Sequence, residues 1–204
     1  MSVIGESLYS DEAKPNWYAL IRPTNITDYG TLTRLEYLGN RKTLPLVSAG
    51  EIVFGCEATW RSLVLCEAIE KCTTNFHGTV LYWPGAELNR VIWLRCMLDY
   101  MREIGILRHI AVGGQGGHLS PDYFGSIPIA NFPDSIQEEV ARCYFRQAPP
   151  LGAGPDVDNL VDWHRRHNAQ LGIWDLDSES RHLRRLLRDA QDQVIQGHTV
   201  KVAL

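Results

Sequence analysis

Residues 17–26, WYALIRPTNI, give the clearest local signal in this sequence. Their aromatic and β-branched side chains are typical of a β-strand, and the Thr27-Asp28-Tyr29-Gly30 that follows has the composition of a turn. Residues 31–38, TLTRLEYL, alternate well enough for a second strand that can pair with the first as a hairpin. The chain is therefore expected to begin with β structure.

Short β segments are expected through the first two thirds of the chain. EIVFGC, residues 51–56, is an apolar run after the turn Ser48-Ala49-Gly50, and KCTTNFHGTVLYW, residues 71–83, predicts one or two strands broken at Gly78. HIAVGG, residues 109–114, is expected to be a further strand that leads into a glycine-rich loop.

The hydrophobic period changes to that of a helix at three places. The first is Asn89–Gly105, with Asn89 as the expected N-cap and Gly105 as the stop. The second is Ser135–Arg146, and the third is Asp177–Gln196, which follows an expected turn at Gly172–Asp175. Residues on the expected helical stripes are Val91, Leu94, Met97, Leu98, Met101 and Ile104, then Ile136, Val140 and Tyr144, then Leu183, Leu187, Ala190 and Val194.

Strands followed by helices predict an α+β fold with two regions. The first, residues 1–133, is expected to be a β-rich domain with a packed helix, and the second, residues 134–204, to be a helical arm. QAPPLGAGP, residues 147–155, has the proline and glycine content of a linker within that arm.

Composition excludes several classes of protein. The chain has 204 residues, 20 Lys and Arg against 24 Asp and Glu, a net charge of −4, and 45% hydrophobic residues, so disorder, a collagen-like chain and a strongly basic nucleic-acid coat are disfavoured. Without a signal peptide or a membrane-length apolar run, the expected protein is soluble and cytoplasmic. The five cysteines form no CxxC pair, so we expect reduced thiols, no zinc site and no cofactor.

The loop from Gly113 to His118, GGQGGH, is the most distinctive stretch. Its glycines permit positive φ and leave backbone N–H groups uncovered, which suits either a phosphate or base contact or a flexible turn. It has neither the GK[ST] ending of a Walker loop nor the GxGxxG spacing of a dinucleotide site. No hydrolase or nuclease motif is present, so we expect no intrinsic catalysis; a hydrolase using Cys56 or His118 is the weaker alternative.

An ordered series of motifs resembles the specificity subunits of Type I restriction-modification systems. The counterparts of that family's motifs are Ile21–Ile26 (IRPTNI), Gly50–Phe54 (GEIVF), Thr73-Thr74-Asn75, the Val91–Met101 helix, Gly113–Leu119 and Phe124–Gln137 (FGSIPIANFPDSIQ). Together they cover residues 15–147. Two features depart from the family pattern: Asn131-Phe132 replaces the usual Pro-Leu pair, and the linker at 147–155 interrupts the expected long spacer helix.

The resemblance implies a DNA target-recognition domain without catalysis of its own. Its partners would be double-stranded DNA, a DNA methyltransferase subunit and a motor-nuclease subunit of an antiviral defence complex, with no membrane contact. Because the family usually carries two such domains in one chain, this chain resembles a half-subunit that would pair with a second copy through its C-terminal helices.

The same hypothesis nominates polar side chains at strand ends and in the glycine loop for DNA contact, because such groups bind base edges and phosphates. They are Arg22, Asn25, Arg61, Asn75, Gln115 and His118. Leu183, Leu187 and Val194 are expected to form an assembly face, or alternatively to pack back onto the domain. A second functional alternative keeps the fold but uses it only for protein–protein assembly.

Overall fold

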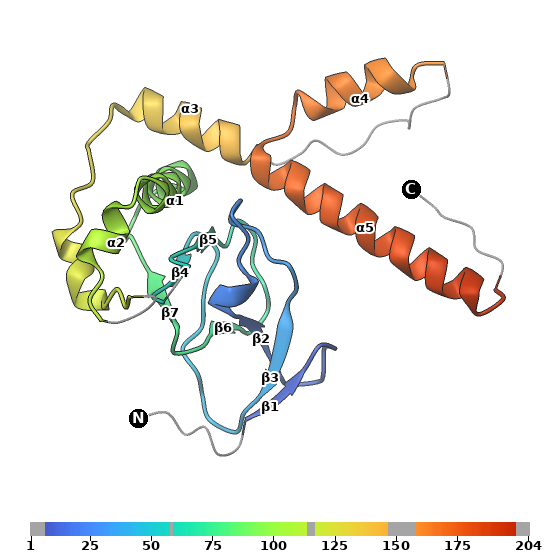
Figure 1. Ribbon diagram of the computed structural model, residues 1–204, viewed down its shortest axis with the longest axis horizontal. Helices are drawn as coiled ribbons and strands as arrows, with labels where there is room; N and C mark the ends of the chain where they lie inside the picture. The colour runs from blue at the N-terminus through green and yellow to red at the C-terminus, as the bar shows by residue number, and fades with distance from the viewer. Residues whose placement is uncertain (1–6, 58, 114–116, 147–157, 199–204) are drawn as a thin grey trace. The chain divides into compact units, whose positions relative to one another are not determined.

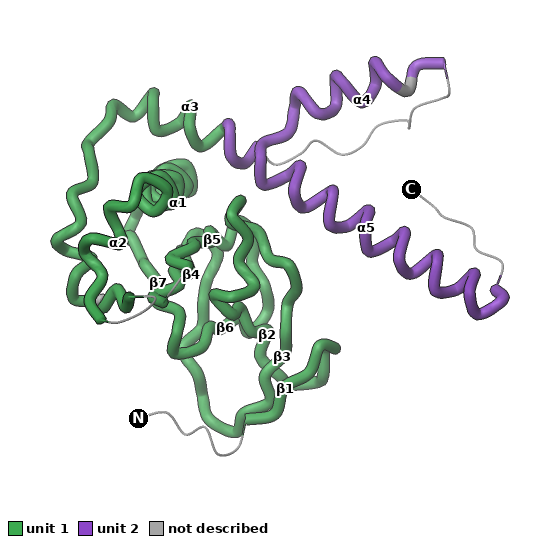
Figure 2. Tube along the Cα trace, viewed as in Figure 1, with its two compact units in different colours: residues 1–142 green, residues 143–204 purple. Residues whose placement is uncertain are grey.

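The structure is a computed structural model that describes residues 7–57, 59–113, 117–146 and 158–198. The chain divides into two compact units, residues 1–142 and 143–204 (Figure 2). Every described strand lies in the first unit, whereas α4 and α5 lie in the second. The predicted α+β class is confirmed.

A four-stranded sheet forms one layer of the first unit. Its strand order is β1-β3-β2-β6, where the strands are β1 (Leu8–Ser10), β2 (Tyr18–Ile21), β3 (Glu36–Gly39) and β6 (Cys72–Thr74). β2 and β3 pair antiparallel, with Tyr18 opposite Leu38, which confirms the predicted hairpin. Both strands are shorter than predicted, because the 3₁₀ helix η2 (Pro23–Asn25) follows β2 and β3 begins only at Glu36. β2 also pairs with β6, but in parallel, with Ala19 beside Cys72.

The second sheet has β4 at its centre. Its order is β5-β4-β7, where the strands are β4 (Ile52–Gly55), β5 (Ser62–Val64) and β7 (Gly78–Leu81). Val53 packs into one core cluster with Ile21, whereas the next residue, Phe54, packs into another with Leu98. The sheet therefore lies between the four-stranded sheet and α1 (Figure 1), and both faces of β4 are covered. Such burial explains why the strand is a continuous apolar run.

The predicted first helix is confirmed as α1 (Leu88–Glu103), with Val91, Leu98 and Met101 buried. Its N-cap is Glu87 rather than Asn89, so the helix begins two residues earlier than expected. α1 packs on β5, where the buried Arg95 donates from Nε to the Ser62 carbonyl at 3.2 Å.

The strand predicted at residues 109–114 is wrong. Residues Ile106–Ile110 form a short helix, α2, and only Val112 makes an isolated β-bridge, with His118. Gly105, at φ +81°, ends α1 and at once allows α2 to start, so the fully buried Leu107 reaches the core from a helix. The apolar run was thus short enough to suit either structure.

Short helices complete the first unit. They are the 3₁₀ helices η2 (Pro23–Asn25) and η3 (Pro121–Ser126) and the α-helix α3 (Asp134–Tyr144). α3 confirms the helix predicted at Ser135–Arg146, and the boundary between the two units falls near its end.

The second unit contains α4 (Leu160–Asn168) and α5 (Ile173–Ile195). The turn predicted at Gly172–Asp175 is instead the start of α5, because the Asp175 carboxylate accepts the Gly172 N–H at 2.8 Å and the Arg146 N–H at 3.0 Å. The linker predicted at 147–155 lies outside the described residues. In the described part of the chain, no helix combines the length and apolarity needed to cross a membrane.

Phe54 should be a major source of stability in the first unit. Its fully buried ring lies edge-on to Phe124, with 5.0 Å between ring centroids. Phe54→Ala should lower the free energy of unfolding by about 3–5 kcal/mol, because the surrounding core cannot fill the cavity. Phe76→Ala is the matched control, since Phe76 is 68% exposed and its loss should cost less than about 1 kcal/mol. Urea denaturation measures both, and equal losses would contradict the predicted core position.

Candidate functional site

The carboxylate of Glu36 holds two of the nominated DNA-contact residues. Glu36 is 5% exposed, and its oxygens lie 2.7 Å from Arg22 Nε and 2.9 Å from an Arg34 terminal nitrogen. Asn25, which is 8% exposed, donates from Nδ2 to Glu36 at 3.0 Å. A base contact by Asn25 would therefore require this hydrogen bond to break. Arg22 keeps part of its side chain at the surface, with its guanidinium 4.7 Å from the Tyr9 ring centroid.

Arg61 is also held by a carboxylate. Its Nε donates to Asp28 at 2.9 Å and one terminal nitrogen donates to the Ile26 carbonyl at 3.1 Å. Asp28 lies in the predicted Thr27–Gly30 turn, which the structure confirms through a Thr27 N–H bond to the Thr31 carbonyl. Arg102 on α1 reaches the same Asp28 oxygen at 3.4 Å. Arg61 thus links β5 to this turn.

Segments far apart in the sequence meet where β2, β4, β6 and β7 adjoin. Thr74 donates from Oγ1 to the Ile21 carbonyl at 2.8 Å, and Pro23 of η2 packs on Gly55. A Cβ at Gly55 would come within 3.0 Å of Pro23, and one at Gly78 would overlap Thr74. Glycine at both positions therefore permits the close packing of η2 on β4 and β7.

The loop after α2 joins the same region. The Cys56 N–H bonds to the His77 carbonyl and the Leu119 N–H bonds to the Cys56 carbonyl, both at 2.9 Å. Glu57 forms an isolated β-bridge with His118. We call the described residues of segments 22–25, 57–61, 74–78 and 112–118 the loop rim.

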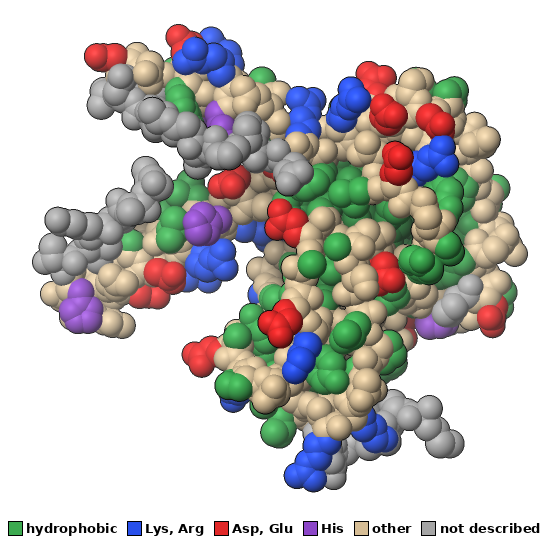
Figure 3. Space-filling model, turned by 180° about the vertical axis from the view of Figure 1, so that it is seen from behind, with side chains coloured by type: hydrophobic (Ala, Val, Ile, Leu, Met, Phe, Trp, Pro, Cys, Tyr) green, Lys and Arg blue, Asp and Glu red, His purple; other side chains and the backbone are tan. Residues whose placement is uncertain are grey.

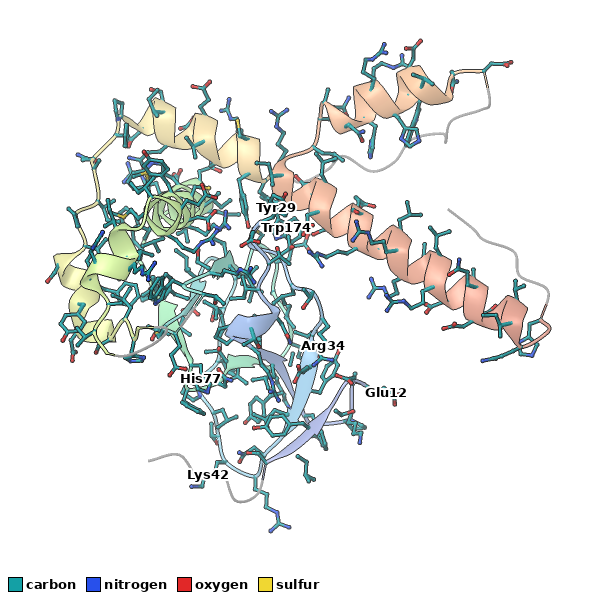
Figure 4. All side chains as sticks on the ribbon, in the orientation of Figure 1. Glu12, Tyr29, Arg34, Lys42, His77 and Trp174 are labelled. Atoms are coloured by element: carbon teal, nitrogen blue, oxygen red, sulfur yellow. The ribbon has the colours of Figure 1, made fainter. Side chains whose placement is uncertain are left out.

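Glu57 is the polar centre of the loop rim. Its carboxylate lies 2.7 Å from His77 Nδ1 and 3.8 Å from His118 Nδ1, so histidines from two loops face one acid. Figure 4 shows His77 at the surface of the β-rich unit. His118 is 50% exposed. Sequence reasoning nominated His118 but did not predict that it faces the same carboxylate, Glu57, as His77, although all three occur in stretches with polar strand ends.

Two aromatic residues of the loop rim were not nominated either. The exposed Phe76 ring lies 3.7 Å from the His77 ring, centroid to centroid, next to the nominated Asn75. Asn75 Oδ1 accepts the His77 N–H at 3.2 Å, which fixes the turn. Trp60 has φ +44°, an uncommon value for a bulky residue, and its buried indole N–H has no hydrogen-bond partner in the described part of the chain.

The glycine loop is described only at its ends. Gly113 and Gly117 have positive φ values of 112° and 56°, in agreement with a glycine requirement there. A Cβ at Gly117 would lie 3.0 Å from the Trp60 ring. The nominated Gln115 lies outside the described residues.

Cys56 is not prepared to act as a nucleophile. Its Sγ is buried 2.9 Å from Thr79 Oγ1, and burial raises the pKa of this thiol. A nucleophilic cysteine needs the opposite shift, so the hydrolase hypothesis gains no support from Cys56. Among the described residues, no group of three or more His, Cys, Asp or Glu side chains is placed to hold a metal ion.

The nominated assembly residues share one exposed face of α5. Leu183, Leu187 and Val194 are all exposed, and their spacing returns them to the same side of the helix. In the second unit, α5 therefore presents an apolar stripe to solvent.

Comparison of the chain with protein-family models and with curated proteins gave no match. The relationship to Type I specificity subunits stays a prediction from the sequence motifs, and so does the DNA-recognition role that it implies.

Glu36→Gln should destabilise the first unit by about 1.5–3 kcal/mol, because the buried charge that binds Arg22, Arg34 and Asn25 is lost. Arg34→Gln is the control: this side chain is 60% exposed, so its ion pair is screened and should be worth less than about 1 kcal/mol. Chemical denaturation at neutral pH compares the two. If Arg34→Gln costs as much as Glu36→Gln, the carboxylate is not the central partner.

Proposed function

We propose that this chain is a non-catalytic DNA-recognition module that directs partner enzymes of a restriction-type defence complex to a target site. The observation that carries the proposal is the convergence of four separate polar segments on the loop rim. Recognition sites commonly have this organisation, with variable loops held by a rigid scaffold. The ordered motifs that resemble Type I specificity subunits point to the same function.

The nominated side chains of the loop rim differ in the role that we assign to them: some position the loops, and others contact DNA. Arg22 and Arg61 are engaged by Glu36 and Asp28, which favours a positioning role for them. His118 is exposed and Asn75 is half-buried, and an amide and an imidazole can each donate to and accept from a base edge. We therefore assign sequence reading chiefly to Asn75 and His118.

Selection of duplexes from a randomised library by the full chain should enrich a defined half-site. Asn75→Ala and His118→Ala should each relax preference at one position, by about 1–3 kcal/mol of discrimination, because a base contact is lost. Binding to every duplex should weaken as salt rises, since phosphate contacts release counterions. Sequencing of the selected pools measures preference, and fluorescence anisotropy measures affinity.

Matched substitutions in the second unit provide the control for this selection. Asn168→Ala and His198→Ala remove the same side-chain types outside the loop rim and should leave the selected sequence unchanged. Flat binding to all duplexes, insensitive to salt, would contradict DNA recognition altogether. An enriched site that neither loop-rim variant alters would contradict only the assignment to Asn75 and His118.

Protein assembly through α5 is the second candidate function, favoured by the periodicity of its exposed apolar stripe. Positions a and d of a heptad repeat are occupied by Ile173, Leu176, Ser180, Leu183, Leu187, Ala190 and Val194. At 1.5 Å per residue the helix is about 34 Å long, enough for three heptads. Such a stripe is the contact face of a coiled coil.

Charges beside the stripe favour a second copy of this chain as the occupant, in parallel orientation. Glu179 falls at position g and Arg184 at the following e, the two positions that meet across a parallel pair. Within the described part of the chain neither side chain has an ion-pair partner, whereas Asp177 is taken by Arg181 at 2.8 Å. Two symmetric Glu179–Arg184 pairs would therefore form between copies.

A charge exchange tests this pairing. Glu179→Arg and Arg184→Glu should each shift the chain towards monomer, because like charges then face each other across the pair, whereas the double variant should restore the dimer. Sedimentation equilibrium measures the association. Arg188→Glu, at position b, is the control and should leave the dimer intact. A wild-type chain that is monomeric throughout the accessible concentration range would exclude the self-pairing.

A further inference from the structure

The two ends of the four-stranded sheet differ in whether their basic side chains form ion pairs. β2 and β6 run parallel and β3 runs antiparallel to them, so the starts of β2 and β6 and the end of β3 lie at one end of the sheet. The loop rim and Glu36 lie at the other end. We call the first of these the far end.

Unpaired basic side chains gather at the far end. Lys14 precedes β2, Arg41 and Lys42 follow β3, and Lys71 precedes β6. In the residues that the structure describes, none of the four has a carboxylate within ion-pair distance, although Glu70 is the sequence neighbour of Lys71. Lys42 lies well away from Glu12 (Figure 4), and basic side chains occupy the lower end of the β-rich unit on the face seen in Figure 3.

A hollow of about 580 Å³ opens at the far end, and of these four basic residues Arg41 lines it. Its lining residues are Ser7, Leu8, Pro15, Asn16, Trp17, Gly39, Asn40 and Arg41. The volume falls within the range of small-molecule sites, about 300–1,000 Å³. No acidic side chain is among the lining residues.

Trp17 is the aromatic residue among those that line the hollow. Its indole lies directly against Gly39, where a Cβ would come within 2.6 Å of the ring, so the close approach depends on glycine. The Lys14 ammonium lies 4.8 Å from the ring centroid. An aromatic ring beside a cation is the combination that binds a stacked base and its phosphate.

The loop that carries Arg41 and Lys42 is fixed by hydrogen bonds. Asn40 accepts the Lys42 N–H at 2.8 Å through Oδ1 and donates to Ser7 Oγ at 3.2 Å through Nδ2. The Tyr18 hydroxyl donates to the Lys42 carbonyl at 3.2 Å. The cations are thus presented by an ordered turn, so less conformational entropy is lost when a ligand binds.

We infer that the far end of the sheet is a nucleotide-binding site, in which a base takes the place of the Lys14 ammonium over the Trp17 ring, and Lys14 then binds the 5′-phosphate together with Arg41. The same chemistry is offered by a free nucleotide or by a nucleotide within a single strand. The site is separate from the loop rim and does not depend on the proposed recognition of duplex DNA.

Titration of the full-length ¹⁵N-labelled chain with 2′-deoxyadenosine 5′-monophosphate tests the inference. The indole N–H resonance of Trp17, assigned through Trp17→Phe, should shift on binding. Arg41→Ala and Lys14→Ala should each weaken binding about tenfold or more, since each removes a charge-assisted contact. Arg108→Ala, an exposed arginine on α2, is the matched control and should bind as the wild type does.

Parallel titrations distinguish the ligand sources. A short deoxyadenosine oligonucleotide that binds more tightly than the mononucleotide supports a single strand as the ligand, whereas equal affinity supports a free nucleotide. Inorganic phosphate that binds as tightly as the mononucleotide would overturn the inference, because no base is then recognised. An unshifted Trp17 resonance, or equal weakening by Arg108→Ala, would also overturn it. None of these results alters the outcome of duplex selection at the loop rim.

Discussion

The buried carboxylate of Glu36 is the constraint around which the first unit is organised. Burial of an unpaired carboxylate would cost several kcal/mol, so this group must be surrounded by donors. Arg22, Arg34 and Asn25 supply them from the connection between β2 and β3. The interaction therefore fixes the start of η2, which in turn packs Pro23 on Gly55 and Gly78 and brings the two sheets into contact. The loop rim therefore depends on the contacts that Glu36 makes at this end of the hairpin.

Local periodicity was sufficient to predict the elements whose burial is simple. α1 buries Val91, Leu98 and Met101 at the predicted helical spacing, and β4 is apolar on both faces, so each pattern has one natural interpretation. The strand predicted at residues 109–114 is wrong at its start, where residues 109–110 end α2, because a short apolar run near a glycine suits a strand or a helix equally well. The start of α5 was missed because it depends on Asp175 accepting the N–H of Arg146, a contact across a gap in sequence that no local pattern reveals.

The segments that form the candidate site could be predicted from the sequence, but the partners of their charged side chains could not. Polar strand ends indicated the segments that meet at the loop rim, whereas their partners arise from tertiary contacts: Glu36 for Arg22, Asp28 for Arg61 and Glu57 for both histidines. A sequence shows which cations a chain has, but only the fold shows which of them are neutralised by neighbours. Here Arg22 and Arg61 are paired, whereas the basic side chains at the far end have no ion-pair partner among the residues that the structure describes.

The parallel pairing of β2 with β6 has a consequence for how the protein is made. β3 can join β2 as soon as the hairpin has emerged, but β6 lies some fifty residues further along the chain, beyond the whole of β4 and β5. Contacts of such long range carry a large loop-closure cost and form slowly. During synthesis the edge of β2 therefore stays open until residues 72–74 arrive, and the nascent chain carries an unpaired strand edge that invites association with other chains. Its early folding thus depends on rapid completion of the segment from β4 to β6.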